Sequence, residues 1–447
     1  MRRPAAAAHD GQARRGRLDG VLSAYQDALD FLFARTTGAF KFGLERTVAL
    51  LAELGDPHHR LRIFHVAGTN GKGSSCATIE ALLRARGLRV AKYTSPHLVD
   101  FRERIVVDGA PIAEDAVVEW LERWTPICLR VGASFFEATT AMAFDHFAHA
   151  GVDAAVIETG LGGRLDSTNV VSPLVAAVTT IGIDHAEYLG ETRESIAGEK
   201  AGIFKPGVPA VIGEADPHIA TLLAEHARRR GASRVVHVPE EYEVSDVALV
   251  AAGTRFTLAR GAERPITLET PLVGRFQASN AALAIATLDA AGPEWRVDLE
   301  EARRALRTVA LPGRFDRRDA WIFDVAHNPD GAAVLAATLG VVAPAVPVVA
   351  LVAVLADKDW RGMISALAPR VSEFVFTCAP TAPANRLWEP DQALAFARER
   401  GWAARVERDF DRALALAPTL GATTLVTGSF HTVGDAMARL QLNPLPG

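Results

Sequence analysis

The chain has 447 residues, of which 49% are hydrophobic and 23% are charged, and its formal net charge is −5. This composition is typical of a folded globular protein, and at roughly 150 residues per domain the length predicts two to three domains. The slight negative charge excludes an overall basic field, so we expect neither nucleic acid nor a membrane as a partner. The cysteines Cys76, Cys128 and Cys378 lie far apart, which argues against a disulfide framework and favours a cytoplasmic protein.

Strand and helix patterns alternate along most of the chain, which predicts α/β layers built on mainly parallel sheets. Residues 1–20 are rich in Arg and Ala and lack the apolar core of a secretory signal, so we interpret them as a disordered tail. A helical opening is predicted over residues 22–55. The first buried strand follows at residues 61–68, and then a helix from Lys72 to Arg86 with Gly87 as its C-cap.

Further short strands and one turn are predicted before residue 308. The apolar strands lie at residues 88–95, 153–160, 174–182 and 208–213. Residues 255–270 have the pattern of a hairpin, with alternating segments on either side of Gly261.

A Pro-Gly pair within residues 308–316 marks a candidate domain boundary, because a second α/β series begins beyond it. The strands of this series are predicted at residues 320–326, 347–355, 373–379 and 423–428. We therefore predict a large domain over residues 21–310 and a smaller one over residues 311–447.

Residues 334–356 carry no charge over a length that could span a bilayer. Gly340, Pro344 and Pro347 interrupt this segment in the middle. We therefore favour a helix that ends near Gly340, a turn through the two prolines and then a buried strand, rather than a membrane span.

The stretch FHVAGTNGKGSS, residues 64–75, resembles a phosphate-binding loop with unusual spacing. In the pattern G-x-x-x-x-G-K-[ST], the first glycine would fall at Val66 and the hydroxyl residue at Gly73, but Ser74 comes one position later. A strand enters the loop and a helix leaves it, which places backbone N–H groups and the positive helix end around a phosphate. Lys72 adds a charge, and Ser74 adds a hydroxyl for phosphate or Mg²⁺. The loop therefore predicts nucleotide binding, and the absence of G-x-G-x-x-G disfavours a nicotinamide cofactor.

A series of motifs between Tyr25 and Asp435 resembles the folylpolyglutamate synthase / dihydrofolate synthase family of the Mur ligase superfamily. In chain order the motifs are GLERTVALLAELGDP, GTNGKGS, YTSPHL, FFEATTAMAF, ETGLGGRLDSTN, GIDHAEYLG, EKAGIFKPG, GRFQASNAALA, PGRFD, DVAHNPDG and TGSF. The resemblance implies a Mur-ligase-like α/β fold. In this fold, a large N-terminal P-loop ATPase-type domain with a mainly parallel sheet precedes a smaller Rossmann-like glutamate-ligase domain.

The resemblance also implies a reaction, its cofactors and its partners. The expected enzyme is an ATP-dependent ligase, ADP-forming, that adds L-glutamate to dihydropteroate, to reduced folates or to both through an acyl phosphate. ATP and Mg²⁺ at two sites are the expected cofactors, and a monomer is the expected state. Phosphorylation converts the carboxylate, a poor acyl donor, into one with a good leaving group, and the protein must hold the reactants in line.

The resemblance assigns the site residues as follows. The ATP site is expected to comprise Gly68, Thr69, Asn70, Gly71, Lys72, Gly73, Ser74, Asn280, Arg314 and Asp324. The metal ligands are expected to be Ser95, Glu158, His185 and Lys200 as a carbamate, and the catalytic residues Lys72, Glu158, His185 and Lys200. The pterin or folate site is expected to comprise Phe42, Ser134, Phe135, Phe136, Glu137, Leu165, Asp166 and Ser167. His327 and Ser429 are expected to contact the incoming glutamate.

Several of these residues also have an ordinary structural interpretation. Glu158 ends a strand and could be a solvent-exposed acid, although the three glycines that follow it favour a close approach to a ligand. His185 could be a structural hydrogen-bonding residue, and Lys200 a surface lysine. Asn280 is placed like a helix N-cap. Phe135 could simply pack in the core.

Three other functions are weighed against this one. Muramyl-peptide ligases carry an additional N-terminal domain, whereas about 65 residues precede the loop here, and their loop tends to have Thr or Ser at the position of Gly73. A P-loop ATPase switch is disfavoured by the second α/β domain and its DVAHNPD motif. A polyglutamylation-only enzyme is disfavoured by SPHL and FFEATTAMAF, which look more like bifunctional bacterial members. His146 and His149 lack the H-E-x-x-H pattern, so zinc is not expected.

Overall fold

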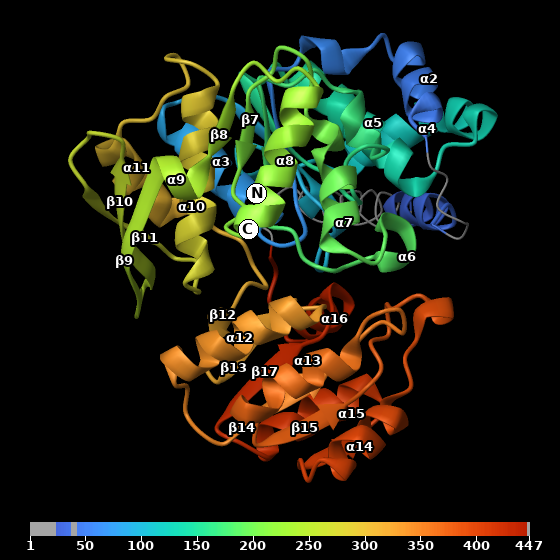
Figure 1. The fold of residues 1–447 in the computed structure, drawn as a ribbon. Helices are drawn as coiled ribbons and strands as arrows, with labels where there is room; N and C mark the ends of the chain where they lie inside the picture. The colour runs from blue at the N-terminus through green and yellow to red at the C-terminus, as the bar shows by residue number, and fades with distance from the viewer. Residues whose placement is uncertain (1–23, 37–42, 445–447) are drawn as a thin grey trace, which may run out of the picture.

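Short, mostly apolar strands build an eight-stranded sheet, which is the centre of the first domain in the computed structural model (Figure 1). The structure describes residues 24–36 and 43–444. The central strand β1 pairs in parallel with β5 and β6, and only the β3 and β4 edge is antiparallel. The strands, in spatial order, are β4 (Ala110–Pro111), β3 (Ile105–Val107), β2 (Val90–Tyr93), β5 (Ala154–Glu158), β1 (Ile63–Ala67), β6 (Val175–Val178), β7 (Ala210–Ile212) and β8 (Val235–His237).

Helices cover both faces of this sheet because β1 and β5 are buried along their whole length and are apolar apart from His65 and Glu158. Phe64 of β1 packs into a core with α3 and α10, whereas its neighbour Ile63 packs on the other face with α4 and α5. The helices of this part are α2 (Glu45–Glu53), α3 (Lys72–Ala85), α4 (Glu114–Val131), α5 (Phe135–Ala150), α6 (Ala186–Leu189), α7 (Arg193–Lys200), α8 (Pro217–Arg229), α9 (Val238–Glu241), α10 (Phe276–Ala290) and α11 (Leu299–Ala305), preceded by a helical segment at residues 24–33.

A separate three-stranded antiparallel sheet lies beside α10 and α11. It consists of β9 (Tyr242–Val250), β10 (Gly253–Arg260) and β11 (Ile266–Thr270), with β10 in the centre. The predicted hairpin is therefore confirmed as the β10–β11 pair, and β9 adds a third strand. Phe256 and Leu268 on its inner side join the core of α3 and α10.

A third sheet is built entirely from residues after 315 and forms the orange and red lower body in Figure 1. Its strands, in spatial order, are β12 (Asp316–Arg318), β13 (Trp321–Asp324), β17 (Thr423–Thr427), β14 (Val348–Val352), β15 (Glu373–Phe376) and β16 (Ala404–Val406). All neighbours are parallel except β12 and β13. The helices around it are α12 (Pro329–Val342), α13 (Trp360–Leu367), α14 (Pro390–Glu399), α15 (Phe410–Leu416) and α16 (Phe430–Arg439).

The lower body touches the first domain through α16. A side chain at Gly434 of this helix would collide with the carbonyl oxygen of Leu98, so the two backbones meet there without a side chain between them. The isobutyl group of Leu98 also lies within 3.4 Å of where a side chain on Gly313 would begin. The segment after β2 is therefore a contact between the two bodies, close to the point where the chain crosses from one to the other.

Most predicted elements are confirmed, and the differences have local causes. The helix within residues 334–356 runs to Val342, beyond Gly340, and stops where Ala343 adopts a left-handed conformation before Pro344. Asn280 lies inside α10 and is not its N-cap, because the helix already begins at Phe276 after a turn at Gly274. Among the described residues, no helix is both long and apolar enough to cross a membrane. The predicted tail at residues 1–20 lies outside the described residues.

Two substitutions compare how much a buried residue of the third sheet and an exposed residue beside it contribute to the free energy of unfolding. Leu351 lies in the centre of β14 and is fully buried, so Leu351→Ala should lower the free energy of unfolding by about 2–5 kcal/mol. Val346 is 77% exposed just before that strand, so Val346→Ala should change it by less than about 0.5 kcal/mol. Denaturant unfolding followed by circular dichroism measures both, and equal effects would contradict this packing.

Candidate active site

The loop at residues 68–74 is fastened to the segment that follows β6. The hydroxyl of Thr69 donates to the carbonyl of Gly182 at 3.1 Å, and the hydroxyl of Thr179 donates to the carbonyl of Asn70 at 2.7 Å. Gly68 has a φ of +148°, and a side chain there would collide with the Thr179 hydroxyl. The loop can therefore keep this path only with glycine at position 68.

The amino end of α3 is open toward the loop. Gly71 occupies the N-cap position with a φ of +90°, and no side chain caps the first backbone N–H groups. Uncapped N–H groups together with the helix dipole form an anion site. Lys72 stands at the first position of this helix, and its Nζ lies 3.1 Å from the carbonyl of Gly68 and 3.2 Å from that of Thr69. This arrangement confirms the strand–loop–helix context that the sequence predicts.

Glu158 at the end of β5 provides the carboxylate nearest to this lysine. Its Oε1 lies 3.9 Å from Lys72 Nζ, and its Oε2 accepts the backbone N–H of Ser95 at 3.3 Å. The side chain is buried, and burial raises the pKa of Glu158, while Lys72, the Ser95 N–H and Arg314 oppose the shift. Its predicted alternative as a solvent-exposed acid is wrong. A buried carboxylate of this kind gains from a further cation.

Lys200 ends α7 and points to the same loop. The residue is 5% exposed, and its Nζ donates to the carbonyl of Gly68 at 2.8 Å. Burial and the nearby charge of Lys72 lower the pKa of Lys200 to about 7. The alternative of a surface lysine is therefore wrong. A large fraction of this amine is neutral near neutral pH.

Asp184 joins the two bodies, and the sequence analysis did not identify it. Its carboxylate accepts Lys358 Nζ at 2.5 Å and lies 3.2 Å from His327 Nε2, both from the second body. Burial raises the pKa of Asp184, but the His327 hydrogen bond and the positive groups around it outweigh this and hold it well below its usual range. Burial chiefly lowers the pKa of the adjacent His185 to about 4, so this imidazole is neutral and one of its two ring nitrogens can accept.

These groups surround one cavity of about 660 Å³ between the two bodies. Every predicted site residue within the described ranges lines it, with the exception of Ser74, Asn280 and Asp324. Phe42 lies outside the described residues. Lys358, Arg104, His97 and His431 were not predicted; of these, all but His97 line the cavity.

The three predicted residues outside the cavity lining support its walls. Ser74 is buried in the first turn of α3. The Oδ1 of Asn280 lies 2.5 Å from the position that a Cβ on Gly71 would take, so this side chain backs the loop. Asp324 accepts the backbone N–H groups of Phe315 and Ala326, each at 2.9 Å. It thereby shapes the crossing segment that carries Arg314, whose guanidinium lies 5.4 Å from the ring centre of Phe430.

The predicted pterin residues 134–137 form the first turn of α5. Ser134 and Glu137 make a reciprocal capping box, in which Glu137 Oε2 accepts the Ser134 N–H at 2.7 Å. Arg46 also pairs with Glu137, at 2.9 Å. Phe135 is 7% exposed and stacks on Phe33 with ring centres 5.5 Å apart. These residues therefore both line the cavity and hold the fold, and the S-x-x-E signature of the cap was readable from the sequence.

The Asp166 carboxylate is likewise engaged within its own loop. It accepts the N–H groups of Gly160 and Leu161 at 2.9 and 2.8 Å and that of Thr168 at 3.0 Å. The glycine-rich turn after Glu158 is closed by this one side chain. Asp166 therefore gives the wall its shape.

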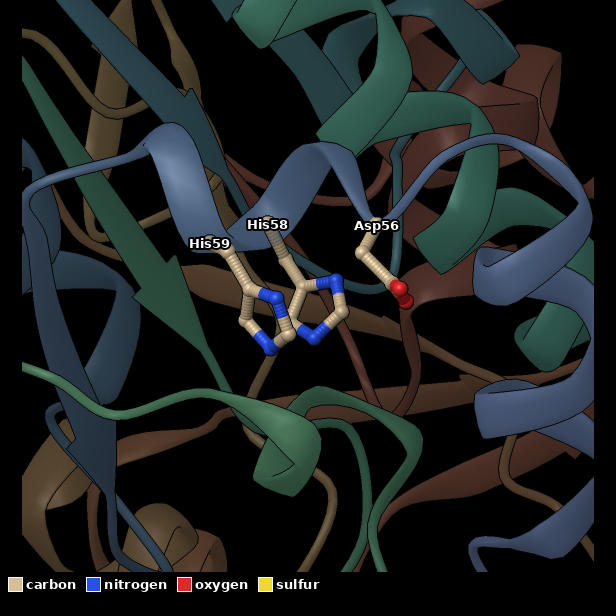
Figure 2. Close-up of side chains that lie close together, drawn as sticks. All are labelled: Asp56, His58 and His59. Atoms are coloured by element: carbon tan, nitrogen blue, oxygen red, sulfur yellow. The ribbon is translucent and has the colours of Figure 1, made fainter.

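A second group of metal-ligand types lies away from the cavity. Asp56, His58 and His59 at the turn before β1 have ligand atoms within 4.8 Å of one another, with both imidazole rings on the same side of the turn (Figure 2). Burial and the neighbouring His59 lower the pKa of His58 to about 4. None of the three lines the cavity.

Comparison with known proteins agrees with this architecture. Residues 66–288 match the Mur ligase middle domain, and residues 313–430 match the Mur ligase glutamate ligase domain. The two matches define a Mur-type ligase, in which a nucleotide loop and a second α/β domain face one cavity.

Individual relatives narrow the class. The chain is 33% identical to the Bacillus subtilis dihydrofolate synthase/folylpolyglutamate synthase, over 94% of this chain and 100% of that protein. It is 36% identical to the Escherichia coli protein of the same name, over 93% and 94%. The chain belongs to the dihydrofolate synthase/folylpolyglutamate synthase family.

Solved structures extend the likeness to three dimensions. The Mycobacterium tuberculosis folylpolyglutamate synthase complexed with ADP and AMPPCP superposes with a TM-score of 0.85 at 33% identity, covering 95% of this chain and 100% of that one. A bifunctional folylpolyglutamate synthase/dihydrofolate synthase with Mn, AMPPNP and L-glutamate bound gives a TM-score of 0.77 at 36% identity, covering 93% and 98%. The predicted Mur-ligase-like fold is confirmed.

The open helix end can be tested with two glycines of matching backbone conformation. Gly71→Ala places a Cβ 2.5 Å from Asn280 Oδ1 at a φ of +90°, so the loop must shift and ADP affinity should fall about 10- to 100-fold. Gly87→Ala at the other end of α3 has a φ of +77° and no atom within 4 Å, so it should lower stability by about 1–2 kcal/mol and leave ADP affinity intact. Calorimetric titration with ADP decides, and equal affinities for the two variants would contradict the role of the loop.

Proposed function

We propose that the protein is an ATP-dependent, ADP-forming ligase that adds L-glutamate both to dihydropteroate and to reduced folates. One observation carries this proposal: a phosphate loop, a buried carboxylate, a buried lysine and groups of a second α/β domain converge on one cavity. The names of the relatives, which combine dihydrofolate synthase and folylpolyglutamate synthase, support both activities.

In this proposal, the loop binds the phosphates of ATP. The uncapped N–H groups of α3 meet the phosphate oxygens, and Lys72 adds a charge that can follow the transferred group. Arg314 stands on the crossing segment, where its guanidinium approaches the same cavity from the second body. Asn280 keeps the loop in place behind Gly71.

The oxygen groups at the ends of these strands are suitable ligands for divalent metal ions. Glu158 offers a buried carboxylate 3.9 Å from its nearest cation, and Ser95, whose N–H it accepts, offers a hydroxyl at the same edge. Hard oxygen ligands of this kind suit Mg²⁺, and a solved relative contains Mn. When bound, the metal would neutralise charge on the phosphates during transfer. His185 and Lys200 would hold a second ion.

Lys200 is proposed to carry a carbamate. Capture of CO₂ joins the amine nitrogen to the carbon and releases a proton, which requires the neutral amine. Burial and the positive charge of Lys72 make that form accessible because they lower the pKa of Lys200 to about 7. The product is an anion, which suits a position between Lys72 and a metal better than an ammonium does.

The acceptor and donor substrates would meet between the two bodies. The carboxylate of the pteroate or folate receives the phosphoryl group beside Lys72, and the amine of glutamate then attacks the acyl phosphate and displaces phosphate. His327 and Ser429 follow strands of the second body and line the cavity, which supports their assignment to the incoming glutamate. The division at residues 310 and 311, the cytoplasmic location and the monomeric state stay predictions.

The reaction is tested by product mass. Purified protein with ATP, Mg²⁺, bicarbonate and L-glutamate should add one glutamate to 7,8-dihydropteroate in one tube and to tetrahydrofolate in another. A gain with tetrahydrofolate alone would mean a polyglutamylase only. ATP hydrolysis without any gain in mass would overturn the ligase and favour a nucleotide switch.

The carbamate is tested by its pH dependence. The Lys200 pKa of about 7 lies below the ordinary 10.5, so the amine is mostly neutral at pH 8 and mostly protonated at pH 6. Enzyme stripped of CO₂ should therefore regain activity with bicarbonate far better at pH 8 than at pH 6. Isotope-labelled bicarbonate should give a carbamate signal by NMR that Lys200→Ala removes.

Lys205 provides a matched control for this experiment. Burial also lowers its pKa, but its Nζ donates to the carbonyl of Asn169 and it does not line the cavity. Lys205→Ala should keep the carbamate signal. Loss of the signal in this variant, or its persistence in Lys200→Ala, would contradict the assignment.

A further inference from the structure

Arg104 is a buried cation that pairs with no acid in the described part of the chain. It stands at the end of a short 3-10 helix, Phe101–Arg104, and is 7% exposed. No carboxylate of a described residue forms an ion pair with its guanidinium, and its one side-chain hydrogen bond is from Nε to His97 Nδ1 at 2.7 Å. Burial of an unpaired charge is costly, so this site is incomplete without an anion.

The guanidinium is held in one place from several sides. Its carbon lies 5.1 Å from the ring centre of Phe135, and its Nε is fixed by His97. Because Nε can only donate, Nδ1 of His97 must accept and the imidazole must be neutral. A capping box of Asp100 and Glu103 fastens the short helix itself. The side chain is therefore preorganised, which lowers the entropy cost of binding a ligand.

The free edge of Arg104 belongs to the cavity. Arg104 lines it together with Glu158 and with residues 429–431 of the second body. The terminal nitrogens make no hydrogen bond to a described residue and are absent from the buried polar atoms without a partner, so they reach the open space. A planar guanidinium edge of this kind matches a carboxylate with two parallel hydrogen bonds.

We propose that Arg104 binds a carboxylate of the incoming L-glutamate, and that His97 is the positioning residue that orients it. The inference rests on the proposed ligase function. Glutamate brings carboxylates that keep their charge throughout the reaction, whereas the carboxylate that becomes phosphorylated belongs beside Lys72. Burial, Arg386 and then Arg104 lower the pKa of His431, which places this residue of the second body near the guanidinium. A glutamate between Arg104 and His431 would therefore touch both bodies.

Steady-state kinetics of Arg104→Lys and Arg104→Ala tests the proposal with dihydropteroate and with tetrahydrofolate as acceptors. Loss of a charged, two-pronged contact should raise KM for L-glutamate about 10- to 100-fold with both acceptors. The KM for the acceptor and the affinity for AMPPNP should stay near those of the unaltered protein, which also shows that the variants are folded. Arg104→Lys keeps the charge but loses the planar edge, so its KM for L-glutamate should lie between that of the unaltered protein and that of Arg104→Ala.

Glutamate analogues give a sharper readout. L-glutamine and glutamate α-amide each lack one carboxylate, and the unaltered protein should discriminate against the one whose missing group Arg104 binds. Arg104→Ala should no longer discriminate against that analogue, but it should still discriminate against the other analogue. In a double-mutant cycle, His97→Ala should raise KM for glutamate by itself but add nothing to Arg104→Ala, because it acts through that residue.

Arg102 is the matched control. It lies two residues away, pairs with Asp100 at 2.6 Å and Glu114 at 3.3 Å, and does not line the cavity. Arg102→Lys should leave every kinetic constant near its original value. An unchanged KM for glutamate in Arg104→Ala would overturn the inference, as would a defect confined to the KM of tetrahydrofolate, which would place the carboxylate of the folate tail there. Failure of the unaltered protein to add glutamate would instead overturn the ligase function itself.

Discussion

Two lysine side chains converge on one carbonyl oxygen, that of Gly68, and the electrostatics of the cavity follow from this contact. Lys72 approaches it at 3.1 Å and Lys200 at 2.8 Å. Burial of Lys200, and after it the nearby charge of Lys72, lower the pKa of Lys200 and favour its neutral form. Lys72 lies at the uncapped amino end of α3, 3.9 Å from the buried carboxylate of Glu158. A ligand charge that enters this cavity therefore meets groups that are already in place.

Parallel strands explain why these groups meet. The carboxyl ends of neighbouring strands lie at the same edge of a sheet, and β1, β2, β5 and β6 deliver the loop, Ser95, Glu158 and Asp184 to that edge. The third sheet repeats the arrangement: β13, β14 and β17 are followed by His327, Lys358 and Ser429, which line the same cavity. Two sheets that face each other through their carboxyl ends bring these side chains to one cavity without long excursions of the chain.

The loop was predictable because its signal is local in sequence, with glycines between a strand and a helix, whereas Ser95, His185 and Lys200 were assigned only by the family resemblance. Asp184 and Lys358 were missed because a pair 174 residues apart leaves no local pattern. The N-cap interpretation of Asn280 was wrong because Gly274 allows the helix to start earlier. Arg104 was missed for a different reason: an arginine in FRER resembles a surface charge until its burial and its lack of an acid are known.

Asp184 forms a buried ionic link between the two bodies. Its carboxylate faces His185 of its own body, yet it is occupied by Lys358 and His327 of the other body. A carboxylate saturated by an ammonium and an imidazole has little attraction left for a free cation. Any separation of the bodies would uncover an anion beside a neutral histidine, whereas their approach would cover it again. The relative position of the two bodies is therefore coupled to the charge of this one carboxylate.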